Sequence, residues 1–479
     1  MPVAAYRCAA IGFCVDMVFS SLLFLFWFIP IFFALYYLVG AKYRNTVLFA
    51  GSIVFYAWGE PSYLILIIVS ILVNYLAGLG LAGCRPDKDH TGFQKTVFVL
   101  TMVFDFGMLF IFKYTGFFTE NINRLFGTGL KDPGFTLPLG ISFYTFQIAS
   151  YVIDLYRGKI KAERNPLILG TYLVMFPQLI AGPIVVYSKV SDALRERSVS
   201  IDRVSEGIET FILGLSSKVL IANTAGELWK DLEAKGYGNI SMPLAWLGVL
   251  AFTLQIYFDF NGYSLMAIGL GKMLGFDLPE NFDHPYVSRS LTEFWRRWYM
   301  TLSAWFRDYV YIPLGGSRRG KMRTYVNLFI VWFLTGFWHG AGWNFICWGL
   351  FFFIFLTLEK AFLGPVLYRH RVFARIYSLL LIGLSWMIFA ITDLSKLLLY
   401  AKRLVSFADV GGWTDTLYYL RNYGLILLLG CLFSTQLPAS FAGRIKNAWV
   451  RCGIFTALLF ICVCFLADAA YNPFLYFRF

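Results

Sequence analysis

Long apolar runs separated by short polar stretches dominate the hydrophobic pattern of this chain. Many of the runs approach the roughly 20 residues that a helix needs to cross about 30 Å of hydrocarbon, and the alternating pattern of a strand barrel is missing. We therefore predict an all-α, polytopic integral membrane protein with about eleven spanning helices. The candidate runs lie near residues 17–39, 45–59, 62–82, 97–117, 137–156, 206–224, 241–263, 325–345, 346–364, 375–393, 423–436 and 452–470.

The pattern contains no repeat, low-complexity tract or large hydrophilic insert, so residues 17–479 are predicted to form one transmembrane domain. Residues 1–16 read as an N-terminal extension, because they lack the charged start and small-residue cleavage site of a signal peptide. The first long apolar run opens at Met17, so the sequence leaves Met1 and Met17 both open as the start.

Composition and charge agree with a membrane setting. The chain is 58% hydrophobic and only 14% charged, and its net charge is +13. The basic residues cluster in short loops between the runs, which is the positive-inside signature, so we expect a lipid bilayer as partner and no nucleic acid. These loops are 40–45, 83–96, 157–165, 318–323, 366–374 and 443–451, and placing them in the cytoplasm puts both termini outside.

Residues 165–189 break the alternation, because basic residues flank this apolar segment on both sides. Pro177, Gly182 and Pro183 interrupt it, and proline removes a backbone donor and kinks a helix. Broken helices survive at membrane depth only where protein or a cavity shelters them. We therefore predict a re-entrant segment that enters the membrane and returns to the same side.

The region 277–323 is too charged to span a membrane and too aromatic for a free loop. Two interpretations stay open: an interfacial amphipathic helix, or a helix that folds inward and presents polar groups to a buried cavity. Helical spacing aligns an apolar stripe, Phe294, Trp298, Leu302, Trp305 and Tyr309, and beside it a polar stripe, Arg296, Tyr299, Ser303 and Arg307. Glu293 and Arg297 form an i,i+4 pair of opposite charge, and Asp308 lies near the same face.

His339, in the stretch LTGFWHGAGWN, follows Trp338 in a very apolar run of a chain that has only four histidines. It would lie about 21 Å into the predicted span, where an ionised group costs about 2.5–3.5 kcal/mol, so we expect a neutral imidazole. A neutral imidazole can act as a general base, and the alternative is a core histidine hydrogen-bonded to a carbonyl. Gly340 and Gly342 would let a substrate or another backbone approach closely.

A second polar cluster, in LQIYFDFNGYS, contains Gln255, Asp259, Asn261 and Ser264 and indicates a wet pocket. The eight cysteines are scattered singly, and no second His or Cys has a ligand spacing to the central histidine, so no metal site is predicted. The chain has no GxSxG, Walker A or GxGxxG context, which argues against a soluble-type hydrolase or a nucleotide site.

Several long motifs resemble the membrane-bound O-acyltransferase (MBOAT) family, specifically its bacterial alginate O-acetylation branch. They include FYAWGEP (55–61), FPQLIAGPI (176–184), EFWRRWYMTLSAWFRDYVYIPLGG (293–316) and FWHGAGWNFICWG (337–349). The resemblance covers nearly the whole chain from Met17. It implies a ring of tilted helices around a central tunnel, and it places the family's catalytic histidine at His339.

The resemblance also implies an enzyme without a bound cofactor that takes an acetyl group from a cytoplasmic thioester, such as acetyl-CoA, to a hydroxyl arriving from outside. In this branch the group passes to an extracytoplasmic SGNH-type acetyltransferase that modifies a polysaccharide, so the bacterial inner membrane is the expected location. The polymer and the acyl length stay open. A transporter or lipid flippase, and a scaffold for a partner acetyltransferase, stay open as other classes of function.

Two positions depart from the family pattern. The second family histidine is Tyr299 here, and a usual aspartate is Leu265. Tyr299 is still predicted as a catalytic partner, whereas His284, in a loop beside a proline, is expected to be an interfacial residue, with replacement of the missing histidine as the alternative. Substrate-binding residues are predicted at Trp338, Trp298, Trp305, Arg296, Arg297, Asp308, Asp259, Gln255, Asn281 and Asn344. Five basic residues lie on the cytoplasmic side, where CoA phosphates would arrive, and positive-inside topology alone predicts the same charges; they are Arg297, Arg318, Arg319, Lys321 and Arg323.

Overall fold

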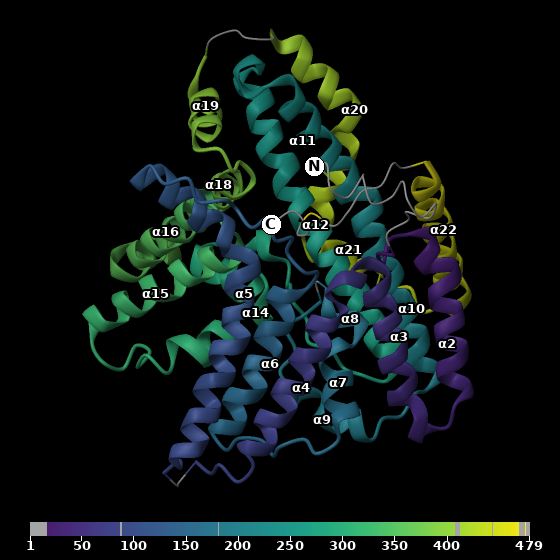
Figure 1. The fold of residues 1–479 in the computed structure, drawn as a ribbon. Coiled ribbons are helices and arrows are strands. Elements are labelled where there is room, and N and C mark those ends of the chain that lie inside the picture. The colour runs from purple at the N-terminus through teal and green to yellow at the C-terminus, as the bar shows by residue number, and fades with distance from the viewer. Residues whose placement is uncertain are drawn as a thin grey trace.

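The structure, a computed structural model, describes residues 17–86, 89–180, 182–407, 412–442, 444–468 and 475. The N-terminal extension predicted at residues 1–16 lies outside the described residues. Every regular element in the described part of the chain is a helix, which agrees with the all-α prediction. Figure 1 shows these helices packed side by side with their axes tilted against one another.

The helices of the first half are η1 (Phe24–Phe28), α2 (Ile29–Leu38), α3 (Arg44–Gly59), α4 (Leu64–Gly80), α5 (Gly92–Phe126), α6 (Ile141–Tyr156), α7 (Pro166–Val174), α8 (Phe176–Leu179), α9 (Tyr187–Arg195), α10 (Ile201–Ser216), η4 (Ser217–Ala222) and α11 (Asn223–Lys235). Those of the second half are α12 (Met242–Leu274), α13 (Leu291–Arg297), α14 (Met300–Phe306), η7 (Arg307–Tyr311), α15 (Lys321–His339), α16 (Trp343–Leu358), η8 (Glu359–Leu363), α17 (Gly364–Arg369), α18 (Arg371–Ala390), α19 (Leu394–Val405), α20 (Gly412–Phe433), α21 (Leu437–Ala442) and α22 (Ala448–Asp468).

All the predicted apolar runs form helices, but fewer than about eleven qualify as full spans. Among the described residues, seven helices are long and apolar enough to cross a membrane: Pro61–Gly80, Gly92–Phe126, Met242–Leu274, Trp343–Arg369, Arg371–Ala390, Trp413–Phe433 and Ala448–Asp468. The other runs are shorter or more polar. α3 and α6, for example, have 16 residues each, which corresponds to about 24 Å. The protein is thus a multi-pass membrane protein in which short helices lie among long ones.

α12 runs through the interior and packs against α10, α11, α18 and α20 (Figure 1). Glycines bring the backbones of α10 and α12 together: a Cβ on Gly207 would lie 2.6 Å from the Gly269 carbonyl oxygen, and one on Gly262 would lie 2.7 Å from the Gly214 carbonyl oxygen. Small residues at such contacts favour helix association inside a bilayer. α12 is therefore held by direct backbone packing in the centre of the molecule.

The first three basic loops lie at one end of the molecule together with the end of α9. The Asn45 side chain donates to the Leu194 carbonyl over 2.6 Å, and Arg197 donates to the Asn45 amide oxygen over 2.7 Å. In the neighbouring loops, a Cβ on Gly158 would lie 2.7 Å from Pro86. This common end is the one that the distribution of basic residues assigns to the cytoplasm.

The segment 165–189 forms the short helices α7 and α8 and the start of α9 instead of one long helix. Its two ends meet, because the Glu163 carboxylate accepts a hydrogen bond from the Tyr187 hydroxyl over 2.6 Å and pairs with Arg195 at 2.7 Å. The chain therefore returns to its point of entry, which is the path predicted for a re-entrant segment.

The continuous helix expected over 293–309 is wrong, because α13 ends at Arg297 and α14 begins at Met300. Between them Tyr299 adopts a φ of 43°, a left-handed conformation that is uncommon for a residue with a side chain. Residues of the segment 281–283 hydrogen-bond to the backbone on both sides of this turn, each over 2.9 Å. This long-range pairing, which helical periodicity does not reveal, breaks the helix.

Candidate active site

His339 is the last residue of α15, and α16 turns back after Gly340 and Gly342. The two helices touch backbone to backbone: a Cβ on Gly336 would collide with the Phe345 carbonyl oxygen, and one on Gly340 would collide with the Phe345 ring. His339 is buried, with 5% of its surface exposed. The glycines thus allow a tight hairpin whose tip holds a buried imidazole.

Aromatic rings surround this imidazole. Its ring centre lies 5.0 Å from that of Trp338, 4.8 Å from that of Trp348 and 5.4 Å from that of Phe389. The Asn344 side chain donates to the Phe389 carbonyl over 3.0 Å and so fixes the end of α18. Asn344, predicted as a substrate ligand, therefore has a structural contact that positions one wall of the site.

α5 holds the end of α15 from the other side. The Lys113 ammonium donates to the Trp338 carbonyl over 2.6 Å and to the His339 carbonyl over 3.2 Å. The Tyr114 hydroxyl donates to the Phe337 carbonyl over 2.7 Å. Two consecutive side chains of α5 thus satisfy the last carbonyls of the helix that ends in His339.

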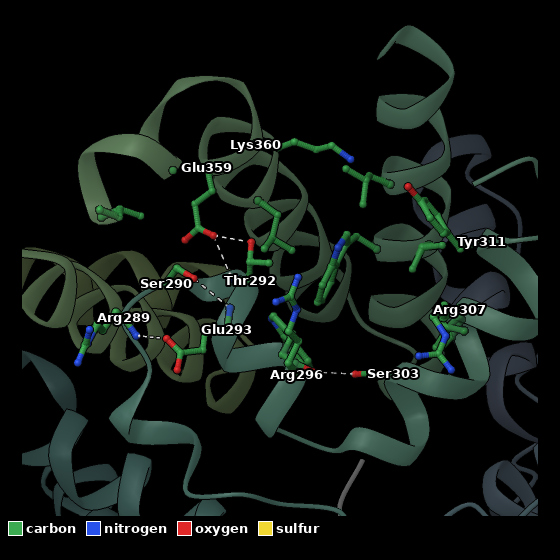
Figure 2. Close-up of a pocket in the computed structure, with 18 of the residues that line it drawn as sticks. Arg289, Ser290, Thr292, Glu293, Arg296, Ser303, Arg307, Tyr311, Glu359 and Lys360 are labelled. Atoms are coloured by element: carbon green, nitrogen blue, oxygen red, sulfur yellow. Dashed lines mark hydrogen bonds between the residues drawn. The ribbon is translucent and has the colours of Figure 1, made fainter. Parts of the chain in front are cut away.

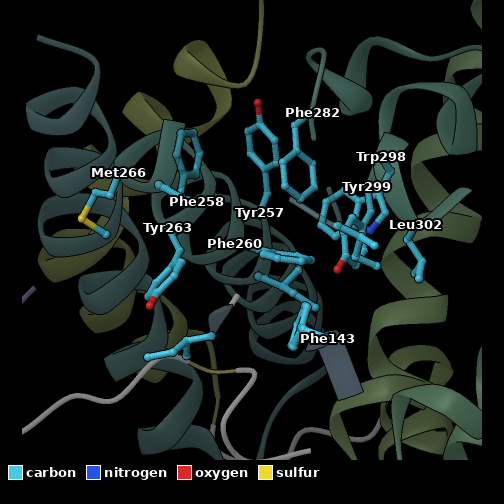
Figure 3. Close-up of a cluster of buried hydrophobic side chains, with 14 of the residues drawn as sticks. Phe143, Tyr257, Phe258, Phe260, Tyr263, Met266, Phe282, Trp298, Tyr299 and Leu302 are labelled. Carbon is cyan, nitrogen blue, oxygen red and sulfur yellow. The ribbon is translucent and has the colours of Figure 1, made fainter. Parts of the chain in front are cut away.

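Tyr299 and His339 both pack against the indole of Trp338. The Tyr299 ring centre lies 6.4 Å from that of Trp338 and 4.7 Å from that of Phe260. Figure 3 shows Tyr299 among the aromatic residues of α12 and of the segment that contains Phe282. Its hydroxyl is buried and has no hydrogen-bond partner among the described residues. The structure therefore brings the two predicted catalytic residues to one indole.

Trp298 and Trp305 are each one ring removed from the rings around His339. Trp305 stacks on Phe146 at 3.9 Å, and Phe146 stacks on Trp338 at 5.2 Å. Trp298 lies 4.7 Å from Trp386, which stacks near Trp348 at 6.2 Å. Both predicted tryptophans therefore support the walls of the site from outside.

Asn281 supports the contact between the region 277–323 and the re-entrant segment, which Thr301 makes. The Thr301 hydroxyl donates to the Asn281 amide oxygen over 2.6 Å and accepts from the Ile184 N–H over 3.0 Å. Asn281 is buried, and its observed contact fixes the Thr301 hydroxyl, which in turn holds the re-entrant segment.

Two other predicted substrate-binding residues, Asp259 and Gln255, have partners away from His339. Asp259 pairs with Lys218 at 2.6 Å, and Gln255 lies against Gly226. Both residues are on the face of α12 that meets η4 and α11, so the predicted wet pocket does not form at His339.

Arg297 pairs with Asp283 at 2.9 Å and with Glu293 at 3.2 Å, and Asp308 pairs with its neighbour Arg307 at 2.7 Å. Arg297 therefore stabilises the turn after α13, and its charge is already matched. His284, at the same turn, lies 3.2 Å from the Asp283 carboxylate.

A cavity of about 1000 Å³ lies between α13, α14, α15, η8 and α17 (Figure 2). Apolar side chains that include Trp295, Leu302, Phe306, Val331 and Trp332 form much of its wall. Its basic side chains are Arg289, Arg296, Arg307, Lys360, Arg369 and Arg371, and its acidic ones are Glu293 and Glu359. Figure 2 shows Arg296 and Arg307 on one side and Glu359 hydrogen-bonded to Thr292 on the other.

One indole connects the wall of the cavity to the histidine. Trp295 lies 5.6 Å from Trp348 and Trp332 lies 6.3 Å from it, and the same indole packs on His339. Thr335, one helical turn before the histidine on α15, also lines the cavity. A single indole therefore separates the cavity wall from the imidazole.

None of the predicted phosphate ligands lines this cavity, neither Arg297 nor the residues of the loop 318–323, whereas Arg296, predicted as a substrate-binding residue, does. The sequence interpretation missed Lys113, Trp348 and Glu359. A lysine inside an apolar run was a usable signal for the first, because charged groups at membrane depth are expensive. Within the described residues, no group of three or more His, Cys, Asp or Glu side chains could hold a metal ion.

This chain belongs to the membrane-bound O-acyltransferase (MBOAT) family: the family model matches residues 165–401, which include the hairpin and the cavity. The protein is therefore a multi-pass membrane O-acyltransferase.

The relatives of this chain indicate which kind of O-acyltransferase it is similar to. The probable alginate O-acetylase AlgI of Pseudomonas putida is 38% identical over 495 residues, which cover 97% of this chain and 100% of the relative. The protein of that name from Pseudomonas syringae pv. tomato is 44% identical over 380 residues, which cover 78% of this chain and 72% of the relative. A peptidoglycan O-acetyltransferase of Helicobacter pylori is 32% identical over 430 residues, covering 82% and 81% of the two chains. The chain is thus related to bacterial O-acetyltransferases.

Proposed function

We propose that this O-acyltransferase takes an acetyl group from a cytoplasmic thioester of the acetyl-CoA class and passes it to a hydroxyl, for O-acetylation of an extracytoplasmic polysaccharide. One observation carries the proposal. Trp348 packs on His339 and on Trp295 and Trp332, which line the basic cavity, so the cavity wall lies one indole away from the buried imidazole. His339 is the general base of this proposal.

The cavity suits a donor with a phosphorylated head and a less polar arm. Guanidinium groups bind phosphate through two parallel hydrogen bonds, and Arg296 offers an exposed one at the cavity. The apolar wall of Trp295 and Trp332 would accept the arm that carries the thioester. Arg369 and Arg371 at the cavity belong to the predicted cytoplasmic loop 366–374, so the donor would enter from inside.

The reaction needs one proton to move twice. The acceptor oxygen attacks the thioester carbonyl while His339 takes its proton; a C–O bond forms, the C–S bond breaks, and the thiolate leaves and receives the proton. The aromatic walls exclude water, which would otherwise hydrolyse the donor. The buried Tyr299 hydroxyl could donate to the carbonyl oxygen as negative charge develops on it.

The names of the relatives suggest the acceptor. Alginate O-acetylases and a peptidoglycan O-acetyltransferase both modify hydroxyls of extracytoplasmic polymers, so we propose a polysaccharide as the final acceptor here. We further propose a bacterial inner-membrane location and an extracytoplasmic SGNH-type acetyltransferase as the partner that receives the acetyl group.

The decisive experiment uses purified protein in proteoliposomes, with acetyl-CoA labelled in its acetyl group outside, and with the partner acetyltransferase and uronate oligosaccharides inside. We expect release of free CoA thiol and label in the oligosaccharide, and we expect His339→Ala to lower both by about 10²–10⁴-fold. His370→Ala, at an exposed histidine before α18, is the matched control and should keep full activity. Labelled acetyl-CoA that crosses unchanged would indicate a transporter, and turnover independent of His339 would refute the assignment of the base.

The position of the donor is tested separately with Arg296→Ala. Loss of a charge-assisted hydrogen bond worth about 1.5–3 kcal/mol should raise the KM for acetyl-CoA by about 10–100-fold and leave kcat close to normal. Arg318→Ala removes an arginine that does not line the cavity and should change neither constant. Equal effects of the two substitutions would argue for general surface charge instead of a donor site in the cavity.

A further inference from the structure

Lys113, inside the apolar helix α5, places a cation against the backbone of the proposed base. Besides the carbonyls of Trp338 and His339, its ammonium donates to the Ser142 hydroxyl over 3.2 Å. An ammonium has three N–H groups, so these acceptors account for all of them. Among the ion pairs of the described residues, none includes Lys113.

The end of α15 needs such donors. The last carbonyls of a helix have no partner within the helix, and they carry the negative end of its dipole. The chain continues through Gly340 in an extended conformation, so no further helical turn can satisfy them. Tyr114 caps the Phe337 carbonyl, and Lys113 caps those of Trp338 and His339.

We propose that Lys113 is a positioning residue for acyl transfer: it fixes the backbone of His339 and thereby aims the imidazole. The carbonyl and the side chain of His339 leave the same Cα, and the ring is confined by Trp348 and Phe389 on its far side. With the backbone also tied to α5, little freedom is left for the imidazole. A base must lie within hydrogen-bond reach of the proton that it removes, and a misplacement of about 1 Å can cost about 10²-fold in rate.

This place needs a side chain with several donors. Ser142 belongs to α6 and the two carbonyls belong to α15, so one side chain must reach acceptors on two helices at once. A residue that only filled space would be apolar, since a charge at this depth costs several kcal/mol. The observed contacts therefore indicate a role in fixing the end of α15.

The inference rests on the proposed function, and its test is a kinetic comparison of variants in the proteoliposome assay. We expect Lys113→Met to lower kcat by about 10–100-fold while the KM for acetyl-CoA stays within about twofold. Lys113→Arg should restore kcat to within about fivefold, because a guanidinium also carries several donors. Lys95→Met removes an exposed lysine from the first turn of the same helix and should have no effect.

His339→Ala is measured beside these variants so that the two ideas can fail separately. If His339→Ala keeps its turnover, the proposed function fails. If His339→Ala is inactive but Lys113→Met has the kcat of the unaltered protein, only the positioning role of Lys113 fails. A higher KM with an unchanged kcat would also overturn it, because that result would assign Lys113 to donor binding.

A variant that does not fold would not end the test. Lys113→Gln keeps two N–H groups without the charge and should fold where Lys113→Met does not. Its kcat should fall by about 3–30-fold with an unchanged KM, since one acceptor loses its donor and the others keep weaker bonds. A normal kcat in folded Lys113→Gln would overturn the proposal.

Discussion

Replacing Glu359 with alanine tests how the wall of the cavity is held in place. The Glu359 carboxylate is buried, and it accepts hydrogen bonds from the first turn of α13: from the Leu291 N–H over 2.7 Å, the Thr292 N–H over 2.9 Å and the Thr292 hydroxyl over 2.6 Å (Figure 2). α13 carries Trp295 and Arg296 to the cavity. Loss of the carboxylate should therefore destabilise the protein and weaken donor binding together.

The burial of the N–H and O–H groups that bond to Glu359 sets the size of the loss in stability. Leu291 is fully buried, so its N–H would lose its only acceptor with no water to replace it, at a cost of about 1–3 kcal/mol. Thr292 is exposed, so its two donors can turn to water, and their loss should cost about 1 kcal/mol together. We expect a total loss of about 2–4 kcal/mol in the free energy of unfolding. If about 1.4 kcal/mol of this appears at the donor site, the KM for acetyl-CoA rises tenfold.

The assay compares thermal unfolding in detergent with the KM for acetyl-CoA in proteoliposomes. Glu359→Gln keeps one carbonyl oxygen for the Leu291 N–H, so its Tm and KM should lie between those of Glu359→Ala and the unaltered protein. Glu120→Ala removes an exposed carboxylate paired with Arg124 and should shift stability by less than about 1 kcal/mol. An unchanged Tm and an unchanged KM in Glu359→Ala would refute the view that this carboxylate holds the wall.

Two further substitutions test the fold around the site. Burial alone would raise the pKa of Glu163, but hydrogen bonds from the Tyr187 hydroxyl, the Asn165 N–H and the Arg195 guanidinium outweigh it and hold that pKa below its usual value. The stabilisation by Glu163 is therefore complete above pH about 4.3 and is lost as the pH falls through the lowered pKa. The Tm difference between the unaltered protein and Glu163→Gln should accordingly be constant near neutrality and shrink in acid. A difference that grows in acid would contradict this. Gly336→Ala would force a Cβ against the Phe345 carbonyl oxygen, so it should lower the free energy of unfolding by about 1–3 kcal/mol and remove most of the turnover. Gly453→Ala, with open space around it, should be neutral or slightly stabilising in the same measurements. Normal activity in Gly336→Ala would show that the hairpin tolerates opening.

The apolar pattern predicted the helices well, because a long apolar run inside a membrane must satisfy its own backbone hydrogen bonds and therefore forms a helix. The re-entrant path of 165–189 was also predictable, since Pro177 and Pro183 limit the length of any helix there. The number of full spans was not: α3 and α6 are apolar runs that form helices of 16 residues, and runs of this kind look the same in sequence whether they face lipid or neighbouring helices.

The site was predictable only as far as single residues carry a signal. His339 and its neighbour Trp338 stand out in an apolar run, and the structure buries them as expected. The turn at Tyr299 depends on pairing with a segment more than ten residues away, which helical spacing cannot show. Asp259 looked like part of a wet pocket because its partner, Lys218, lies on another helix.

The distribution of charge supports the polyanionic donor that we propose for the cavity. Charges elsewhere have fixed partners: Lys218 has Asp259, and Lys113 has the end of α15. The cavity differs, because several of its cations take part in none of the ion pairs of the described residues; these are Arg289, Arg296, Lys360, Arg369 and Arg371. Its two carboxylates are already engaged, that of Glu359 by α13 and that of Glu293 by Arg297. The excess positive charge therefore remains available to a mobile ligand, and a donor with several phosphate charges matches it better than a neutral lipid or sugar would.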